Sequence, residues 1–263
     1  MDFDDTFDRV ATRSTKWTGM GAAFGLDGED LLPMWVADMD FRPPGFLTDT
    51  VHGLAAAGDF GYFSHSQSYF DAVAWWTRTR HGWEIDPSWI TPAASLGNAI
   101  AFAIQTWSAP GDGVAIFTPV YHEFSKKIRK NKRLVTELPL IADDGRFTLD
   151  FDRYEEAMCG NEKILILCSP HNPGGRVWTA EELRAIADFA ERHDLLLISD
   201  EVHNDLVMPG FVHIPMAIAA PDVHHRLVTM TSASKTFSIA GARLGAVIIG
   251  DDALRRDFAG RVS

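Results

Sequence analysis

The chain carries a lysine between two hydroxyl residues, followed eight positions later by an arginine. Lys235 stands in the run Ser232-Ala-Ser234-Lys235-Thr-Phe, and Arg243 ends the same loop. Apolar, strand-like runs enclose the segment on both sides. An amine in a short loop beside a buried sheet can attack a carbonyl group and can also act as a base. Lys235 is therefore the first candidate for chemistry, with a surface lysine as the alternative.

Two further polar groups follow apolar strand patterns. Residues 195–199 lead into Asp200, and residues 163–168 lead into Asn172. An amide, an acid and a lysine thus leave the ends of three predicted strands. These groups suit pyridoxal phosphate, because the lysine can form an imine, the acid can pair with the pyridinium nitrogen and the amide can donate to the ring oxygen. Taken singly, the acid could cap a turn, and Asn-Pro-Gly-Gly could be a plain turn.

A phosphate group would need its own donors. Arg243 supplies a forked, permanently charged donor, and Ser232 and Ser234 supply hydroxyls. Gly97 and Asn98 open a predicted helix, where backbone N–H groups favour anions. These five residues form the predicted phosphate site.

Two loop features add to the candidate site. Tyr121 follows a strand and a proline, so its ring could stack on a cofactor or pack in the core. A cis bond between Asn172 and Pro173 would help to aim the amide. His224 and His225 are neighbours that cannot converge on one metal ion, and no metal site is expected.

Composition narrows the function classes. The 263 residues are 46% hydrophobic and 23% charged, typical of a globular protein, and the net charge is −12. This charge argues against nucleic acid or an anionic membrane as partner. Residues 126–133 carry six basic side chains in eight positions, which we interpret as the solvated face of a helix end.

The sequence indicates a cytoplasmic protein. The two cysteines, Cys159 and Cys168, form no CxxC pair, which fits a reducing compartment, and Cys168 is expected to be buried at the end of a strand. The acidic N-terminus differs from a secretory signal. No apolar run approaches the roughly 20 residues of a membrane span.

Strand and helix patterns alternate along most of the chain. Residues 1–45 are irregular and rich in aromatic residues and proline, and residues 46–263 form the expected large domain. Alternation predicts a three-layer α/β sandwich with a largely parallel sheet, whose ligands gather at the carboxyl ends of the strands. Thr179 and Glu182 predict a capping box. The helix that it opens should bury four residues: Leu183, Ile186, Ala187 and Ala190.

Six segments together resemble the aspartate-aminotransferase superfamily (class I/II, fold type I) of pyridoxal-phosphate enzymes, and most closely the MalY/PatB-type C–S lyases, or cystathionine β-lyases. His203 stands where ordinary aminotransferases of the superfamily usually have tyrosine. The resemblance covers essentially the whole chain. Its segments are Thr15-Lys-Trp17, residues 32–41 (Leu-Pro-Met-Trp-Val-Ala-Asp-Met-Asp-Phe), Gly61-Tyr62, residues 169–175 (Ser-Pro-His-Asn-Pro-Gly-Gly), Asp200-Glu-Val-His203-Asn-Asp205 and residues 232–237 (Ser-Ala-Ser-Lys-Thr-Phe).

The resemblance implies a role for each candidate. Lys235 would be the catalytic Schiff-base lysine, and Tyr121 the catalytic-site ring that stacks on the cofactor. Tyr62 would reach the phosphate of a neighbouring subunit, so a homodimer is expected. The other roles are the pyridinium partner Asp200, the ring-oxygen residues Asn172 and His203, the phosphate residues Ser232, Ser234, Arg243, Gly97 and Asn98, and the substrate-carboxylate side formed by Ala37 and Asp38.

Members of this family continue for about a hundred residues more, as a small C-terminal domain with an arginine that grips the substrate carboxylate. Residues 251–263 read as the start of a helix without a compact ending. We therefore expect the small domain to be missing and substrate binding to be impaired.

Three functions remain open at the level of sequence. The first is a β-lyase that cleaves L-cystathionine or related cysteine thioethers to a thiol, pyruvate and ammonia. The second is an aminotransferase that needs a 2-oxo acid acceptor. The third is a non-catalytic, cofactor-binding regulatory protein. His203 in the Asp-Glu-Val-His run favours the lyase.

Overall fold

The computed structural model describes residues 4–5, 7–26, 31–62, 64 and 67–262. The chain divides into two compact units, which are described separately. One unit joins Met1–Ser64 to Ala233–Ala242, and the other joins His65–Ser232 to Arg243–Ser263. This division differs from the boundary expected near residue 45. Helix α3 (Gly45–Ala57) buries none of its residues, so it adds nothing to a packed core.

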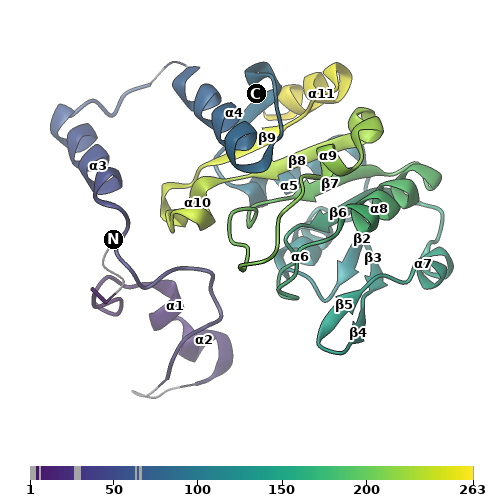
Figure 1. Cartoon of the computed structure of the whole chain (residues 1–263), viewed down its shortest axis with the longest axis horizontal. Helices are drawn as coiled ribbons and strands as arrows, with labels where there is room; N and C mark the ends of the chain where they lie inside the picture. The colour runs from purple at the N-terminus through teal and green to yellow at the C-terminus, as the bar shows by residue number, and fades with distance from the viewer. Residues whose placement is uncertain (1–3, 6, 27–30, 63, 65–66, 263) are drawn as a thin grey trace. The chain divides into compact units, whose positions relative to one another are not determined.

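Hydrogen bonds of polar side chains connect the segments of the first unit. The buried Lys16 donates from Nζ to Asp40 Oδ2 (2.6 Å) and to the carbonyl oxygen of Asp38 (3.0 Å). Trp17 Nε1 donates to Asp40 Oδ1 (2.8 Å). Besides α3, the elements of this unit are α1 (Thr15–Thr18), α2 (Met20–Phe24), α10 (Ala233–Thr236) and η3 (Ala240–Ala242); α1 and α2 are purple in Figure 1.

The second unit is built on a sheet of seven strands, counted over the described residues, in the order β1-β9-β8-β7-β6-β2-β3. Strands β3, β2, β6, β7 and β8 run parallel, whereas β9 is antiparallel to both β8 and β1. The strands are β1 (Ile90–Ala93), β2 (Gly113–Thr118), β3 (Leu134–Pro139), β6 (Glu162–Cys168), β7 (Leu196–Asp200), β8 (Leu227–Thr231) and β9 (Gly245–Ile248), beside a separate hairpin of β4 (Ile141–Asp143) and β5 (Arg146–Thr148).

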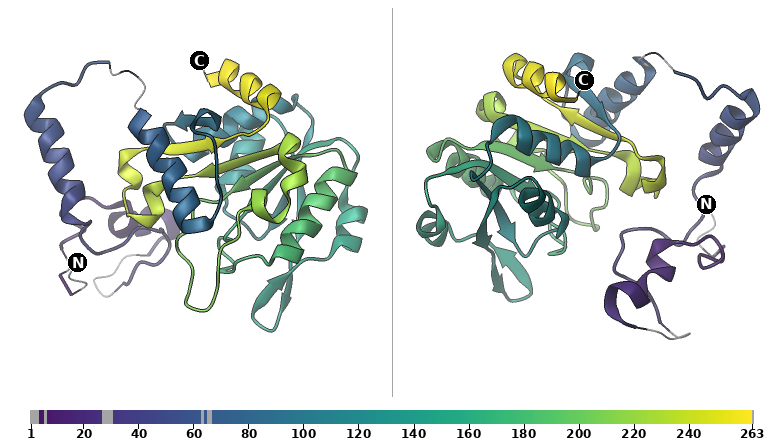
Figure 2. Two further views of the ribbon diagram at one scale, coloured as in Figure 1. Left: turned by 45° about the horizontal axis from the view of Figure 1, so that its top comes forward. Right: turned by 180° about the vertical axis from the view of Figure 1, so that it is seen from behind.

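Helices cover both faces of this sheet (Figure 2), so the predicted three-layer α/β architecture is confirmed. One face packs against α7, α8 and α9, and the other against α5, α6 and α11. The helices of this unit are α4 (Gln67–His81), α5 (Leu96–Trp107), α6 (Glu123–Lys130), α7 (Phe151–Ala157), α8 (Ala180–Arg192), α9 (Met216–Ala219) and α11 (Asp252–Val262), with the short 3₁₀ helices η1 (Pro87–Trp89) and η2 (Pro221–Arg226).

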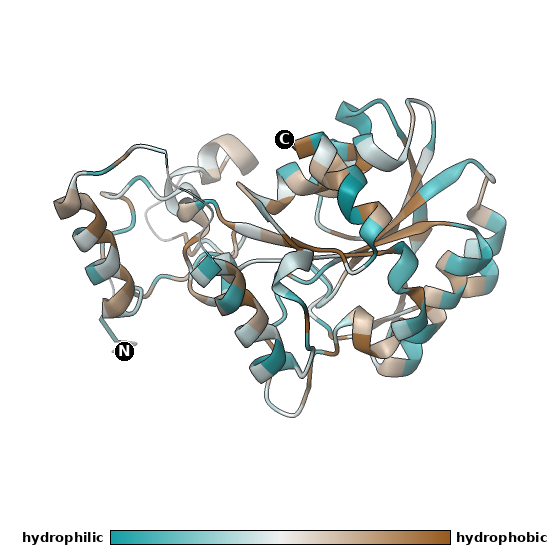
Figure 3. Ribbon diagram, turned by 90° about the horizontal axis from the view of Figure 1, so that it is seen from above, coloured by the Kyte–Doolittle hydropathy of each residue, from teal (hydrophilic) through white to brown (hydrophobic). Residues whose placement is uncertain are grey.

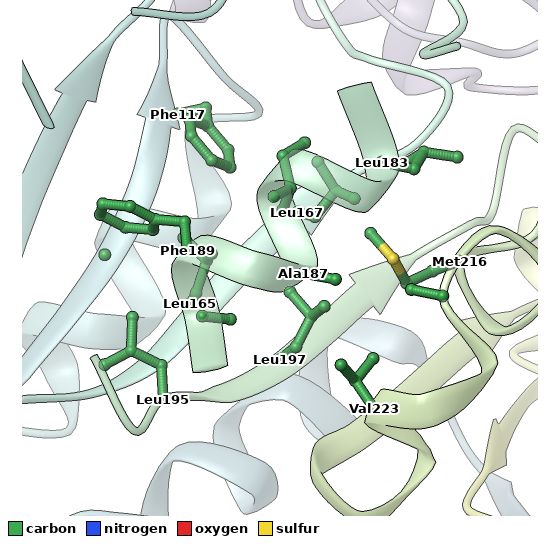
Figure 4. Packing of buried hydrophobic residues seen from close by; sticks show 14 of the residues in the cluster. Phe117, Leu165, Leu167, Leu183, Ala187, Phe189, Leu195, Leu197, Met216 and Val223 are labelled. Atoms are coloured by element: carbon green, nitrogen blue, oxygen red, sulfur yellow. The ribbon is translucent and has the colours of Figure 1, made fainter. Parts of the chain in front are cut away.

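Strand β6 illustrates why its residues form a central strand. Leu165 and Leu167 point into the cluster beneath α8 (Figure 4), whereas Ile164 and Ile166 belong to the cluster beneath α5. Both faces are therefore apolar, which explains the continuous hydrophobic run and the brown strands of Figure 3. Burial of each such side chain contributes about 1.5–3 kcal/mol.

The local predictions for α8 are confirmed. Thr179 Oγ1 accepts from the N–H of Glu182 while the Glu182 carboxylate accepts from the N–H of Thr179, forming the predicted capping box. The four residues expected to be buried are fully inaccessible: Leu183, Ile186, Ala187 and Ala190. Because the cap fixes where α8 begins, these residues meet the sheet.

No helix among the described residues is both long and apolar enough to cross a membrane.

Candidate active site

Asp200 is the last residue of β7 and is 5% exposed. Its Oδ1 accepts from the N–H of Val202 (3.2 Å), and its carbonyl oxygen accepts from the N–H of Ser169 (2.9 Å). Cys168, the last residue of β6, is its register partner. Burial, with the Asp200 carboxylate as a further cause, raises the pKa of the Cys168 thiol well above its ordinary range. A buried carboxylate therefore stands at the carboxyl end of the sheet.

Asn172 is tied to the same sheet edge. Its N–H donates to Cys168 Sγ (3.3 Å), and the Cys168 thiol donates to the carbonyl oxygen of Pro170. The bond between Asn172 and Pro173 is cis, as the sequence suggested. Cys168 is buried, as predicted, and links the Asn172 loop to the strand that neighbours Asp200. The amide and the acid thus leave adjacent parallel strands.

Tyr121 follows β2 at the same edge and is 40% exposed. Burial raises the pKa of its hydroxyl, and the negative charge of Glu123, then that of Asp200, adds to the rise. Its ring meets Phe124 edge-on, with centroids 5.7 Å apart. The structure therefore brings Tyr121, Asp200 and Asn172 to the same edge of the sheet.

His171 holds the Tyr121 loop to the Asn172 loop. The buried imidazole donates from Nε2 to the carbonyl oxygen of Pro119 (2.8 Å). Burial lowers the pKa of His171 and favours its neutral form. The sequence gives no sign of this role for His171, because the contact joins residues 52 positions apart.

The predicted phosphate residues near α5 occupy its first turn. The Ser95 hydroxyl caps the helix by accepting from the N–H of Asn98 (3.2 Å), so that donor already has a partner. Gly97 lies beside Lys127, since a Cβ on this glycine would be 3.5 Å from Lys127 Cε and 3.9 Å from its Nζ. An ammonium group next to the positive end of a helix indicates a place suited to an anion.

Lys127 lies within residues 126–133, which we interpreted from the sequence as the solvated face of a helix end. The side chain of Lys127 is only 26% exposed and its Nζ lies 3.6 Å from Glu123 Oε2. Arg133 is also buried and donates to the Ser108 hydroxyl (2.9 Å). That interpretation was therefore wrong at Arg133, because this guanidinium satisfies groups at the end of α5.

Two of the remaining predicted phosphate residues belong to the second unit. Ser232 is nearly buried and donates from Oγ to the carbonyl oxygen of Leu244. Arg243 is exposed and adopts a positive φ of 51°. A left-handed conformation is uncommon for arginine and marks a locally determined loop.

Lys235 and Ser234 lie in α10 of the first unit, with residues 37–40. Lys235 Nζ donates to the carbonyl oxygen of Ala37 (3.1 Å). Asp38 accepts from the Ser238 hydroxyl (3.1 Å) and forms an ion pair with Arg9. The structure thus brings the predicted imine lysine to the two residues predicted for the substrate side, and the charge of Asp38 is balanced.

Tyr62, also in the first unit, is fully exposed. Its predicted contact with a neighbouring subunit stays a prediction.

A cavity of about 590 Å³ opens beside Asn172 in the second unit. His203 lies in its wall together with three apolar side chains of the following loop, Leu206, Met208 and Phe211. The two residues predicted for the ring oxygen, Asn172 and His203, therefore face one cavity.

The donor set fits pyridoxal phosphate. Asp200 is a buried carboxylate suited to a pyridinium nitrogen, Asn172 is an amide in the loop after the neighbouring strand, and Tyr121 is an aromatic ring close enough for the charge of Asp200 to raise its pKa. In the first unit, Lys235 is an amine that bonds to a backbone carbonyl. Among the described residues, no group of three or more His, Cys, Asp or Glu side chains could hold a metal ion.

The sequence pattern described as aminotransferase class I and II matches residues 56–262. The chain belongs to this family. It is 39% identical to cystathionine β-lyase PatB of Bacillus subtilis over 98% of its length and 66% of that protein. It is 36% identical to protein MalY of Escherichia coli, covering 97% of this chain and 65% of the relative.

A solved structure agrees with the sequence relatives. Cystalysin from Treponema denticola, whose crystal structure contains pyridoxal 5′-phosphate, matches with a TM-score of 0.93 and 36% identity. The match covers 99% of this chain and 66% of cystalysin. The chain therefore spans about two thirds of the length of these relatives and shares the fold of the part that it matches.

Proposed function

We propose that this chain binds pyridoxal phosphate and forms the cofactor-binding part of a β-C–S lyase. The substrate class is L-cystathionine and related cysteine thioethers. With one water molecule, such a thioether yields a thiol, pyruvate and ammonium, which balances all atoms. The observation that carries the proposal is the gathering of Asp200, Asn172 and Tyr121 at one sheet edge, in a chain that is similar to PatB over nearly its whole length.

Pyridoxal phosphate supplies an aldehyde that condenses with amines and a ring that accepts electron density from the substrate Cα. Asp200 would keep the ring nitrogen protonated, because a buried carboxylate stabilises a neighbouring cation. Asn172 would donate to the ring oxygen, with His203 beside it. Tyr121 would stack on the ring and limit its tilt. These roles remain our proposal for each residue.

Lys235 would hold the aldehyde carbon in the resting enzyme. Once displaced by the substrate amine, its Nζ would take the proton from the substrate Cα, and this transfer lets the β-carbon lose its sulfur. The carbonyl oxygen of Ala37, 3.1 Å from Nζ, orients the amine. Ala37 and Asp38 would line the side of the substrate carboxylate.

The cofactor phosphate would need several donors at once. We assign it to Ser232, Ser234, Arg243 and the helix start at Gly97 and Asn98. Since the Asn98 N–H is engaged by Ser95, Gly97 is the stronger backbone donor of the two. Tyr62 would reach the phosphate of a second copy, which makes a homodimer part of the proposal.

A cytoplasmic location also belongs to the proposal. Both cysteines are free, with Cys159 exposed and Cys168 buried, as expected in a reducing compartment.

The cofactor is tested by incubating the chain with pyridoxal phosphate, removing the excess by gel filtration and recording the visible spectrum. Borohydride reduction and peptide mapping should then place the reduced cofactor on Lys235. Absence of a retained band, or a label at another lysine, would contradict the site.

An aminotransferase is the second candidate, because the matching family bears that name. Pyruvate formed in equal amount to consumed L-cystathionine, without an added 2-oxo acid, supports the lyase. A strict requirement for the acceptor supports the aminotransferase. Retained cofactor without turnover of any amino acid would instead support a regulatory role.

A further inference from the structure

Glu201 directly follows Asp200 and is 2% exposed. Its Oε1 accepts from the Ser199 hydroxyl (2.9 Å) and from the N–H of Met216 (3.0 Å). Its Oε2 lies 3.1 Å from Nε2 of the buried His213. A buried carboxylate is tolerated only when such partners replace water. Both carboxylate oxygens of Glu201 therefore have hydrogen-bonding partners inside the protein, and Glu201 has no role in the proposed chemistry.

The contacts of Glu201 join the two ends of the loop between β7 and α9. Glu201 begins the segment after β7, whereas His213 and Met216 end it, so one side chain joins the two ends of residues 201–216. Compact loops of up to about 16 residues whose ends lie close together are frequently functional.

Asp205 anchors the middle of the loop to α4. Its carboxylate accepts from Trp76 Nε1 (3.0 Å to Oδ2) and lies 3.1 Å from His81 Nε2. The rings of His81 and His213 meet edge to face with centroids 5.5 Å apart. The two carboxylate anchors thus share one buried cluster, and the loop is preformed.

The loop formed by residues 201–216 adjoins or contains several groups of the candidate site. Asp200 immediately precedes Glu201, and His203 lies between the two anchors. The Glu201 N–H donates to the carbonyl oxygen of Met230 on β8 (2.8 Å), which fixes the backbone next to Asp200. Phe211, in the same loop, lines the cavity beside Asn172. A shift of this loop would move the cavity wall and disturb the backbone that follows the acid.

We infer that Glu201 is a positioning residue that acts on bound pyridoxal phosphate through Asp200 and His203. The inference rests on the proposed function, since it requires the cofactor to bind there. Glu201→Gln keeps only one side-chain oxygen, so an amide NH2 group then faces either the His213 ring or the Ser199 hydroxyl and Met216 N–H. A buried donor that loses its acceptor is unfavourable.

The test compares Glu201→Gln with Glu191→Gln, a matched change at an exposed position of α8. Glu201→Gln should weaken binding of pyridoxal phosphate about tenfold, speed amide hydrogen exchange in residues 201–216 and move the pH midpoint of the bound cofactor's visible absorption. This midpoint reports the charge beside the ring. Because Glu201→Gln itself removes a nearby charge, a variant that keeps both acids is needed to attribute the change to positioning. Glu191→Gln should match the unmodified chain in all three measurements.

His213→Asn provides a second variant, which removes the partner of Glu201 and leaves both acids in place. It should change the same measurements in the same direction. Faster exchange in the loop of either folded variant, with unchanged affinity and pH midpoint, would overturn the inference. If the unmodified chain retains no cofactor on Lys235, the proposed function fails instead, so the two failures are distinguishable.

Discussion

His171 Nε2 lies 2.8 Å from the carbonyl oxygen of Pro119 and joins the loop after β6 to the loop after β2. Asn172 follows the first of these residues, and Tyr121 lies two positions after the second. One hydrogen bond of the buried His171 therefore fixes the spacing between the proposed ring-oxygen donor and the proposed stacking ring. Because burial lowers the pKa of His171, this donor does not depend on a charged imidazole.

We expect His171→Phe to weaken binding of pyridoxal phosphate about tenfold, because the change removes the donor and leaves the Pro119 carbonyl unpaired. Affinity is measured by titration with the cofactor, and the thermal midpoint is recorded for each variant. His122→Phe is the control, since the His122 side chain is 68% exposed. Equal affinities of the two variants would remove His171 from the site.

Replacement of Lys235 by alanine should abolish the borohydride-reducible adduct and lower turnover by at least about a hundredfold, because the chain loses both the imine-forming amine and the base. Mass spectrometry of peptides after reduction provides the measurement. Lys126→Ala, at an exposed position of α6, should behave like the unmodified chain. Turnover that survives in Lys235→Ala would refute the site assignment.

Acid should destabilise the second unit partly through Glu162. Burial alone raises the pKa of this carboxyl, but hydrogen bonds from Thr136 Oγ1 and from the N–H groups of Cys159 and Gly160 outweigh it and hold the pKa below the ordinary value of 4.5. A lowered folded-state pKa favours the native state above the unfolded-state value. This contribution is lost as the pH falls through the folded-state pKa, below 4.5.

The corresponding measurement is urea unfolding at a series of pH values. Glu162→Gln should reduce the free energy of unfolding at neutral pH and flatten its decline in acid. An unchanged acid slope in the variant would assign the decline to other carboxylates.

Leu165→Ala tests the central packing. Leu165 is fully buried beneath α8, so its truncation should lower the free energy of unfolding by about 2–5 kcal/mol. Leu134→Ala is a matched control, because Leu134 is 56% exposed on β3, and surface changes of this kind usually cost less than about 0.5 kcal/mol. A similar loss in both variants would contradict the assigned core.

The features that the sequence predicted well are local. The apolar run that ends at Cys168 forms β6, and Thr179 with Glu182 forms the capping box. A strand pattern or a cap depends on residues within a few positions, so the order of neighbouring residues is enough to recognise it. Asp200 was singled out because it ends such a strand, and Asn172 because it lies in the loop that follows one.

The features that escaped prediction are contacts between distant positions. His171 meets Pro119, Glu201 meets His213, and Lys127 lies beside Gly97. None of these pairs has a characteristic spacing, because the folded sheet, and not the sequence, brings them together. Residues 233–242 belong to the same unit as the N-terminal residues, although the two are far apart in the sequence. Hydrogen bonds such as that from Lys235 to the carbonyl oxygen of Ala37 connect them.

The pairing of β1 with β9 has a consequence for biosynthesis. Ile90 lies opposite Ile248, so two adjacent strands are 158 positions apart in the chain (248 − 90). During translation, β1 cannot gain its neighbour until nearly all of these residues have left the ribosome. Ile85 and Ile90, which pack against Ala246 and Ile248 in the mature fold, lack these two neighbours until then. An interruption of synthesis before β9 would therefore release a chain with an open apolar edge, prone to aggregate.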